Sequence, residues 1–306
     1  MPVPLPEHYT FVRDLGEGTY GTVVLARDDR RSHTDNPFVA IKVIDTRQVQ
    51  HKYIRQEVSV HKSARHKHIV HVHEKVEMED DFVALVMDYV RGGDLFAYVS
   101  KRRCLPEHQA RWIFQQLMYA VLYLHESVGA AHRDIKPENI LIDDSDADFP
   151  SIYLTDFGFA KYSGVNPTIS NVGTPTYLAP EVFHRRDKSA TAYNGQMADI
   201  WSCGVCLFVM IYGIYPQLTN AGPGRDPQYV VDLDGIQCSL YESVRVGGVS
   251  KRVSEGAMRL IRGMMAPNPA SRATLADIWR DPWFLKDIPK DVGRALPRGT
   301  AAFSSR

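Results

Sequence analysis

The chain has 306 residues, 44% of them hydrophobic, which excludes general disorder and allows one large core or two smaller ones. Its 36 basic and 36 acidic side chains balance, so no overall field draws the chain toward nucleic acid or a lipid surface. Four cysteines and an N-terminal segment without an apolar stretch argue against a disulfide framework and a signal peptide, so we expect a cytoplasmic or nuclear protein with no nucleic-acid or membrane partner.

The first part of the chain has the pattern of a sheet. Strand-like runs occupy residues 11–15, 22–26, 38–44 and 81–87, and glycine-rich or polar turns separate them. One predicted helix interrupts the strands at residues 53–64. The pattern therefore predicts a small sheet with one main helix.

Helical patterns follow Gly92 and Gly93. Residues 106–125 carry one apolar stripe, with Pro106 suited to a first turn, and helical patterns dominate residues 181–285. The apolar run 203–215 is shorter than the roughly 18 to 20 residues that cross a bilayer, so we predict a buried helix there.

These patterns predict an α+β protein with two lobes. We expect an N-terminal extension at residues 1–8, a small sheet lobe at 9–87, a hinge at 88–93, a mainly helical large lobe at 94–288 and a disordered tail at 289–306.

The stretch from Leu15 to Val23 contains Gly16, Gly18 and Gly21 in a G-x-G-x-x-G-x-V pattern. A dinucleotide site would need a helix after the glycines, but the residues that follow favour a strand, and a Walker loop would need Gly-Lys-Ser/Thr. The remaining interpretation is a hairpin turn whose backbone amides approach phosphates.

Strand alternation in Val39-Ala40-Ile41-Lys42 places Ala40 and Lys42 on one face. Taken alone, Lys42 is better explained as an edge-strand lysine that keeps the protein soluble. Glu57, on the predicted helix, would neutralise Lys42 and hold it toward an anion.

Polar residues crowd the stretch A-H-R-D-I-K-P-E-N-I-L-I-D at residues 131–143. Asn139, together with Asp156 after a second strand-like run, offers the oxygen ligands that suit Mg²⁺. Asp134, with Lys136 beside it, is placed to orient a hydroxyl group, and we expect residues 140–142 to anchor the stretch as a short core strand.

Together these motifs resemble the eukaryotic protein kinase family. The matching segments are Gly16 to Val23, Val39 to Lys42, His132 to Asn139, Asp156-Phe157-Gly158 and Ala179-Pro180-Glu181, and the resemblance covers residues 9–288. It implies the bilobal kinase fold, with a small antiparallel sheet lobe and a larger mainly helical lobe, and with ATP and Mg²⁺ in the cleft between them.

The resemblance also implies roles for single residues. Lys42 would bind phosphates and pair with Glu57, Asp134 would accept or orient the substrate hydroxyl proton, Lys136 would neutralise the phosphoryl group, and Asn139 and Asp156 would hold metal ions. Glu181 would pair with Arg272 in the large lobe. The implied nucleotide-binding residues are Leu15, Gly16, Gly18, Gly21, Val23, Ala40, Lys42, Met87, Asp88, Tyr89, Val90, Asp94 and Leu141.

Within the family, the motifs K-P-E-N and G-T-P-T-Y have the serine/threonine form. The chain resembles the calcium/calmodulin-dependent kinase group, especially the AMP-activated-kinase relatives that include plant osmotic-stress and abscisic-acid kinases, with checkpoint kinases next. Asp94 and Glu138 imply protein substrates with Arg or Lys upstream of the acceptor Ser or Thr.

Activity control is expected in the hydroxyl-rich segment between Asp156 and Glu181. Arg133 and Lys161 form a cationic pocket that a phosphate on Ser170, or secondly on Thr168, would occupy, which makes an upstream kinase and a phosphatase expected partners. Thr174 is expected near Asp134 rather than as a phosphosite. We expect a monomeric catalytic domain.

Two alternatives belong to other functional classes. A pseudokinase scaffold predicts the loss of Lys42, Asp134, Asn139 or Asp156, and all four are present. A small-molecule kinase of related fold fits poorly with the segment 173–181, which shapes a peptide platform in the family that the chain resembles.

Other features favour structural roles. His66, His68, His71 and His73 alternate with apolar residues as in a strand, so a metal site there is disfavoured, and Cys203 and Cys206 are expected to be buried thiols. The acidic residues 143–148 form a solvated loop rather than a calcium loop. Gln217 and Leu218 replace a common aromatic residue of the family, which affects local packing.

Overall fold

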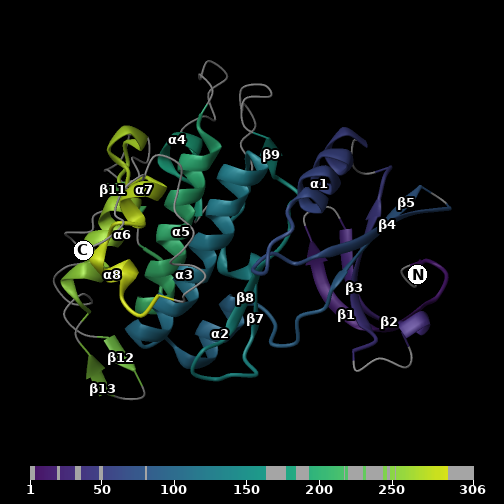
Figure 1. The fold of residues 1–306 in the computed structure, drawn as a ribbon, viewed down its shortest axis with the longest axis horizontal. Helices are drawn as coiled ribbons and strands as arrows, with labels where there is room; N and C mark the ends of the chain where they lie inside the picture. Colours follow the sequence, from purple (N-terminus) through teal and green to yellow (C-terminus); the bar gives the residue numbers. More distant parts are fainter. Residues whose placement is uncertain are drawn as a thin grey trace, which may run out of the picture.

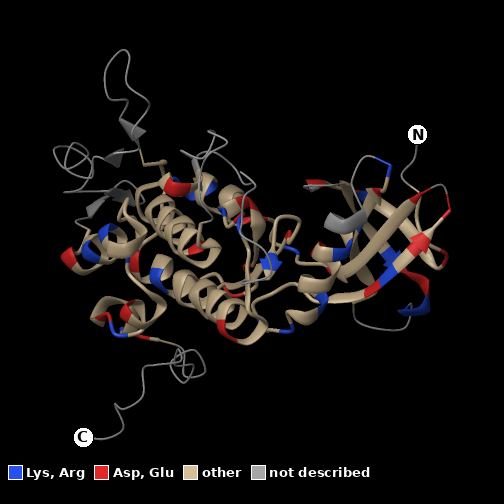
Figure 2. Cartoon of the chain, turned by 90° about the horizontal axis from the view of Figure 1, so that it is seen from above, with Lys and Arg blue, Asp and Glu red and all other residues tan. Residues whose placement is uncertain are grey.

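The structure is a computed structural model with two lobes (Figure 1). It describes residues 4–18, 21–31, 36–47, 51–79, 81–162, 177–183, 193–216, 218–219, 230–231, 244–246, 249–251 and 253–288. Basic and acidic side chains are interspersed over both lobes, in keeping with the balanced charge of the sequence (Figure 2).

The small lobe is an antiparallel sheet with strand order β1-β2-β3-β5-β4 among the described residues. Its strands are β1 (Tyr9–Gly18), β2 (Gly21–Asp28), β3 (Phe38–Asp45), β4 (Val72–Met78) and β5 (Phe82–Asp88), and a short 3-10 turn (Asp29–Arg31) follows β2. Because β3 lies between β2 and β5, Lys42 is on a central strand, and the edge-strand interpretation is wrong.

Helix α1 (His51–Ser63) covers one face of this sheet. Ile54 and Val58 of α1 pack with Ile44, Val83 and Leu85 in one buried cluster. The opposite face of the sheet has its own apolar cluster, which includes Val24, Ile41 and Val43. This packing fixes the position of α1 on the sheet, so that the side chains on its other face can reach the cleft.

The large lobe is built around three long helices, α3 (Glu107–Tyr123), α5 (Gly195–Tyr212) and α6 (Glu255–Met264). Helix α5 packs against both α3 and α6. It is also the one helix among the described residues that is long and apolar enough to cross a membrane, but 83% of it is buried inside the protein, so it is the core helix of this lobe.

Shorter elements complete the large lobe. Its helices are α2 (Leu95–Arg102), α4 (Pro180–Phe183), α7 (Leu275–Ile278) and α8 (Pro282–Leu285), with a π-helical turn at Leu124–Val128 and 3-10 turns at Pro137–Asn139 and Pro269–Ser271. Its strands are β6 (Ala130–Ala131), β7 (Ile140–Asp143), β8 (Ser151–Leu154), β9 (Lys161–Tyr162), β10 (Leu218–Thr219), β11 (Val230–Val231), β12 (Val244–Val246) and β13 (Val249–Lys251).

Helix α5 ends at Tyr212, with Gly213 as its C-cap, so the predicted buried helix over 203–215 extends three residues too far. Gly213 has φ +70, and a Cβ there would meet the Arg103 carbonyl oxygen at 1.6 Å. A left-handed residue with a backbone neighbour this close ends the helix and must be glycine.

Two further predictions need correction. The strand predicted across His66 to His73 is wrong over most of its length, because β4 begins only at Val72. Residues 66–71 instead form a turn and an isolated bridge in which Ile69 pairs with Leu154 of the large lobe. Pro106 occupies the N-cap position of α3 rather than its first turn.

The expected fold is otherwise confirmed, including the ion pair that ties its distant parts together. Arg272 contacts both carboxylate oxygens of Glu181 at 2.8 and 2.9 Å, and its side chain is buried. The predicted tail, residues 289–306, lies outside the described residues, as does Gln217.

Candidate active site

A cavity of about 720 Å³ lies between the two lobes. Its walls come from β1, β2, β3 and α1 on one side and from the segments around β7 and β8 on the other. Of the residues expected at the nucleotide, Leu15, Gly16, Val23, Ala40, Lys42, Met87, Asp88, Tyr89, Val90, Asp94 and Leu141 line it. Sequence alternation thus placed Ala40 and Lys42 on the correct face of β3.

The cavity has an apolar end and a polar end. Met87 and Val70 are buried in one cluster, against which Val90 and Leu141 pack from the hinge and from β7. The polar end holds Lys42, Asp134, Asn139 and Asp156. Such a division suits a ligand with a flat apolar ring and a charged tail.

The other two glycines of the predicted phosphate loop, Gly18 and Gly21, do not line the cavity among the described residues. Gly18 is the last residue of β1 and adjoins residues 19–20, which lie outside the described residues. Gly21 begins β2, and a Cβ there would meet the Val43 carbonyl oxygen at 2.0 Å, so the close approach of β2 to β3 requires glycine. Contact of these two glycines with phosphates stays a prediction.

Lys42 forms two ion pairs deep in the cleft. Its Nζ lies 2.5 Å from Glu57 Oε1 and 2.9 Å from Asp156 Oδ1. Burial alone would lower the pKa of Lys42, but the two carboxylates outweigh it and raise that pKa, so the lysine stays cationic. The predicted pairing with Glu57 is confirmed and joins β3 to α1, while the pair with Asp156 joins β3 to the large lobe.

The catalytic-loop residues are held together by short contacts. Asn139 Nδ2 donates to the Asp134 carbonyl at 2.8 Å and to Asp134 Oδ2 at 3.0 Å, and Lys136 Nζ lies 3.0 Å from the same Oδ2. Asp134 therefore presents a fixed carboxylate, with a cation beside it, on the wall of the cavity.

The hairpin of β7 and β8 explains why Asn139 and Asp156 meet. Ile140 pairs with Leu154, so the residues just before β7 and just after β8 lie side by side. Ile140 and Ile142 are fully buried, which confirms the predicted anchor. Asn139 Nδ2 donates to Asp134, so the amide oxygen of Asn139 and the carboxylate of Asp156 are the oxygen ligands that would suit Mg²⁺.

Asp199 is a site residue that sequence reasoning missed. Its carboxylate accepts hydrogen bonds from the backbone amides of His132 (2.8 Å) and Arg133 (2.7 Å), and it lies 2.8 Å from His125 Nε2. It fixes the loop that carries Asp134. A single acidic residue inside the apolar sequence of α5 was the available signal, because a buried carboxylate needs partners.

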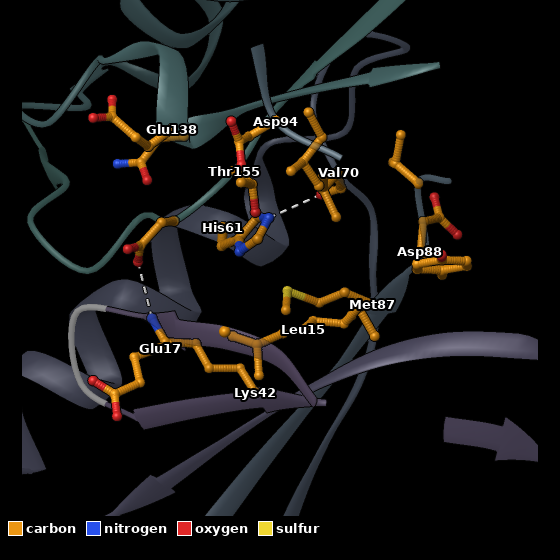
Figure 3. A pocket seen from close by; sticks show the side chains of 18 of the residues that line it. Leu15, Glu17, Lys42, His61, Val70, Met87, Asp88, Asp94, Glu138 and Thr155 are labelled. Atoms are coloured by element: carbon orange, nitrogen blue, oxygen red, sulfur yellow. Dashed lines mark hydrogen bonds and ion pairs between the residues drawn. The ribbon is translucent and has the colours of Figure 1, made fainter. Parts of the chain in front are cut away.

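His61 is a second residue that was missed. It follows Glu57 by one helical turn, so it shares the inner face of α1. Its ring stacks on Phe157 with centroids 4.3 Å apart, Phe157 contacts His132 in turn, and its Nε2 lies 2.8 Å from the Val70 carbonyl (Figure 3). Burial lowers the pKa of His61 to about 4, so the ring is neutral near pH 7.

Glu138 adds an acidic group beside the cavity. Among the described residues, its buried Oε2 atom has no hydrogen-bond partner. Asp94 also lines the cavity, and its Oδ1 accepts from Ala97 N at 2.7 Å and caps α2. Both carboxylates therefore add negative charge to the wall of the cavity.

The structure brings together the two predicted cations of the phosphate pocket. Lys161 pairs through its backbone with Ala131, two residues before Arg133. Partial burial, and then the charge of Arg133, lower the pKa of Lys161. The Arg133 guanidinium is buried and donates to the Tyr193 hydroxyl at 3.1 Å. Ser170, Thr168 and Thr174 lie outside the described residues.

The histidines of residues 66–73 have packing roles. His66 stacks on Tyr123 and meets Tyr119 edge-on, while His73 lies 2.8 Å from Asp88. Cys203 and Cys206 are fully buried, which raises the pKa of both thiols.

The two-lobed fold, with a paired lysine, two aspartates and an asparagine around one cleft, defines the class of protein kinases. The sequence profile of the family described as "Protein kinase domain" matches residues 9–284, and the chain belongs to that family. The expectation of a signalling kinase of the serine/threonine type is confirmed by the family and by its relatives.

Relatives from plants match almost the whole chain. Serine/threonine-protein kinase SAPK3 of Oryza sativa subsp. indica is 35% identical over 289 residues, which is 94% of this chain and 80% of the rice protein. Serine/threonine-protein kinase SAPK2 of the same rice is 36% identical, covering 94% and 79%. Serine/threonine-protein kinase SRK2D of Arabidopsis thaliana is 34% identical, covering 95% and 77%. The expected resemblance to plant kinases of this group is confirmed.

Proposed function

We propose that this chain transfers the γ-phosphoryl group of Mg-ATP to serine or threonine hydroxyls of protein substrates that carry basic residues upstream. The observation that carries the proposal is the convergence of Lys42, Asp134, Asn139 and Asp156 on one cavity. They come from three segments, with Asp134 and Asn139 on one loop, and the ion pairs and hydrogen bonds among them fix their positions before any ligand arrives.

The nucleotide would lie with its adenine ring between Ala40 and Leu141, at the hinge of residues 88–90. Lys42 would exchange its contact with Asp156 for the α- and β-phosphates and would keep Glu57 as its counter-ion. Because the transition state for phosphoryl transfer is loose, fixed charges and alignment supply most of the catalysis.

Asn139 and Asp156 would hold the metal, which supplies charge neutralisation at the phosphate oxygens when bound. Asp134 would accept a hydrogen bond from the substrate hydroxyl and aim its oxygen at the γ-phosphorus. Lys136, 3.0 Å from Asp134 in this structure, would share its charge with the transferred group.

The preference for basic substrates rests on Glu138 and Asp94. Placing a substrate guanidinium beside the Glu138 Oε2 atom would supply the missing hydrogen bond. The predicted register is Arg or Lys two to four residues before the acceptor.

Control by phosphorylation is the second part of the proposal. Arg133 and Lys161 would bind a phosphate on Ser170, or secondly on Thr168, added by an upstream kinase and removed by a phosphatase. We also propose a monomeric kinase of the cytoplasm or nucleus, in keeping with its few cysteines, and the balanced charge of its sequence favours neither nucleic-acid nor membrane partners.

The test is incubation with Mg-ATP and a peptide array, with Asp134→Asn as the inactive control. We expect transfer to Ser and Thr peptides with upstream Arg or Lys, and loss of at least a hundredfold in the control. Preference for proline-directed or acidic peptides would exclude the proposed specificity, and binding of Mg-ATP without transfer to any peptide would support a pseudokinase.

A further inference from the structure

The short strand β9 (Lys161–Tyr162) connects two parts of the catalytic machinery. Through its backbone, Tyr162 pairs with Ala130 of β6, and β6 leads directly into His132 and Asp134. The strand also packs against α1, which carries Glu57 (Figure 1). Tyr162 thus lies between the loop that orients the substrate hydroxyl and the helix that holds Lys42.

The Tyr162 hydroxyl contacts two consecutive turns of α1. Its oxygen lies 3.3 Å from Ser59 Oγ and 3.3 Å from Ser63 Oγ. Ser59 and Ser63 are four residues apart, so they occupy the same face of the helix. A single phenol therefore spans one turn of α1.

These hydroxyls form a chain with a defined direction. Ser63 Oγ donates its hydrogen to the Val60 carbonyl at 2.8 Å, so toward Tyr162 it can only accept. Tyr162 then donates to Ser63 and accepts from Ser59. Phenylalanine at this position would fill the same space but would lose both hydrogen bonds.

A second contact of the same kind lies one turn away. Gln56 Nε2 donates to the Ala160 carbonyl at 2.6 Å, which also joins α1 to the residues just before β9. Glu57 lies between Gln56 and Ser59 in the sequence, so these contacts bracket the residue that pairs with Lys42. Any rotation or outward shift of α1 must break them.

We propose that Tyr162 is a positioning residue, which holds α1 and Glu57 against Lys42 through the hydroxyls of Ser59 and Ser63. Through these contacts Tyr162 connects β9 and the catalytic loop to α1, so that a displacement of one is coupled to the others. The inference rests on the proposed phosphotransfer for its activity readout alone, because the position of α1 can be measured without turnover.

The test compares the full chain with Tyr162→Phe. Amide hydrogen exchange in α1 is expected to rise roughly three- to tenfold, the range for loss of ordinary hydrogen bonds, with exchange in α3 unchanged. The ratio kcat/KM for ATP is expected to fall by about two- to tenfold, while KM for the peptide stays constant. Tyr123→Phe, a tyrosine that packs on His66, is the matched control with no expected change.

A double-mutant cycle identifies the partners. Ser59→Ala with Ser63→Ala should reproduce the effect of Tyr162→Phe, and the triple variant should show no further loss. Threonine at both serine positions keeps the hydroxyls and should restore wild-type behaviour. The serines are exposed, so these variants report even if Tyr162→Phe folds poorly.

Unchanged exchange in α1 overturns the proposal, and so do additive losses in the triple variant. Faster exchange with an unchanged kcat/KM also overturns it, because Tyr162 would then stabilise the helix without serving the reaction. If the wild-type chain transfers no phosphate, the proposed function fails, while the exchange result still decides whether Tyr162 holds α1.

Discussion

At the scale of single residues, Lys42 shows how position decides between a structural and a functional role. On an edge strand it would have been a solubility device, but on the central strand β3 it is buried and paired with two carboxylates. Burying a cation costs free energy unless it has partners, and the two carboxylates of the cleft supply them. Lys42 therefore keeps its charge at a place where phosphates can bind.

The first residue-scale prediction concerns the negative charge of Glu57. Glu57→Gln keeps a hydrogen-bond acceptor but removes the negative charge, so Lys42 would be held by Asp156 instead of being released to phosphates. We expect kcat/KM for ATP to fall about tenfold or more in steady-state assays. The exposed Glu79→Gln is the matched control, and equal activity of both variants would contradict the prediction.

The second residue-scale prediction concerns His61 and pH. The pKa of His61 is lowered from 6.5 to about 4 in the folded protein, so between pH 6.5 and 4 the unfolded chain binds the proton more readily. Its contribution to the free energy of unfolding is therefore present above pH 6.5 and is lost as the pH falls, by up to about 1.4 kcal/mol per pH unit.

The His61→Gln variant tests this dependence. Glutamine can still donate to the Val70 carbonyl but does not titrate, so the stability of the variant should fall less steeply on acidification than that of the wild type. Urea unfolding at several values between pH 5 and 7 measures both slopes. Equal slopes of unfolding free energy against pH in the variant and the wild type would contradict the prediction. The loss of stability on acidification would then come from other groups such as His66 and His68, whose pKa values are also lowered.

At the scale of elements, the Glu181–Arg272 pair joins α4 to the segment before α7. Arg272 also donates to the carbonyls of Met197 and Ala266, at 2.7 and 3.1 Å, so one guanidinium serves several segments. The side chain of Arg272 is fully buried, so water does not compete for these hydrogen bonds.

Removing this guanidinium should destabilise the large lobe. We expect Arg272→Ala to cost about 3–5 kcal/mol of unfolding free energy, because Glu181 and several carbonyls lose a buried partner. Urea or thermal unfolding measures the loss, and Arg280→Ala, at an exposed arginine near α8, is the comparison. A loss below about 1 kcal/mol would mean that the lobe repacks around the missing side chain.

The elements also show what sequence could and could not predict. Alternation and helical stripes located β1, β2, β3, β5, α1 and α3 because the side chains of these elements point to one face by local rules. Residues 66–71 misled the same reasoning, because their backbone bridges to Leu154 of the other lobe instead of extending β4. The roles of Asp199 and His61 could not be predicted, because the residues they contact are distant in sequence and a local pattern does not identify such contacts.

At the scale of the whole molecule, the site exists only where the lobes meet. The small lobe supplies Lys42 and Glu57, and the large lobe supplies Asp134, Asn139 and Asp156. The ion pair between Lys42 and Asp156 is thus also a contact between lobes. A ligand that replaces this contact with phosphates and a metal would bind both lobes at once.

The final prediction follows from that bridging. Mg-ADP at about a hundred times its dissociation constant should raise the free energy of unfolding by about 2.7 kcal/mol, because it binds only the folded chain. Asp156→Asn removes a metal ligand, so it should lose the part of the stabilisation that depends on Mg²⁺ and keep the smaller part that ADP gives in EDTA. Thermal unfolding with ADP, with and without Mg²⁺, separates the two parts, and the exposed Asp148→Asn should behave as the wild type. If Mg²⁺ adds equally to the stability of Asp156→Asn and of the wild type, the metal is held elsewhere, and the carboxylate of Asp156 serves Lys42 alone.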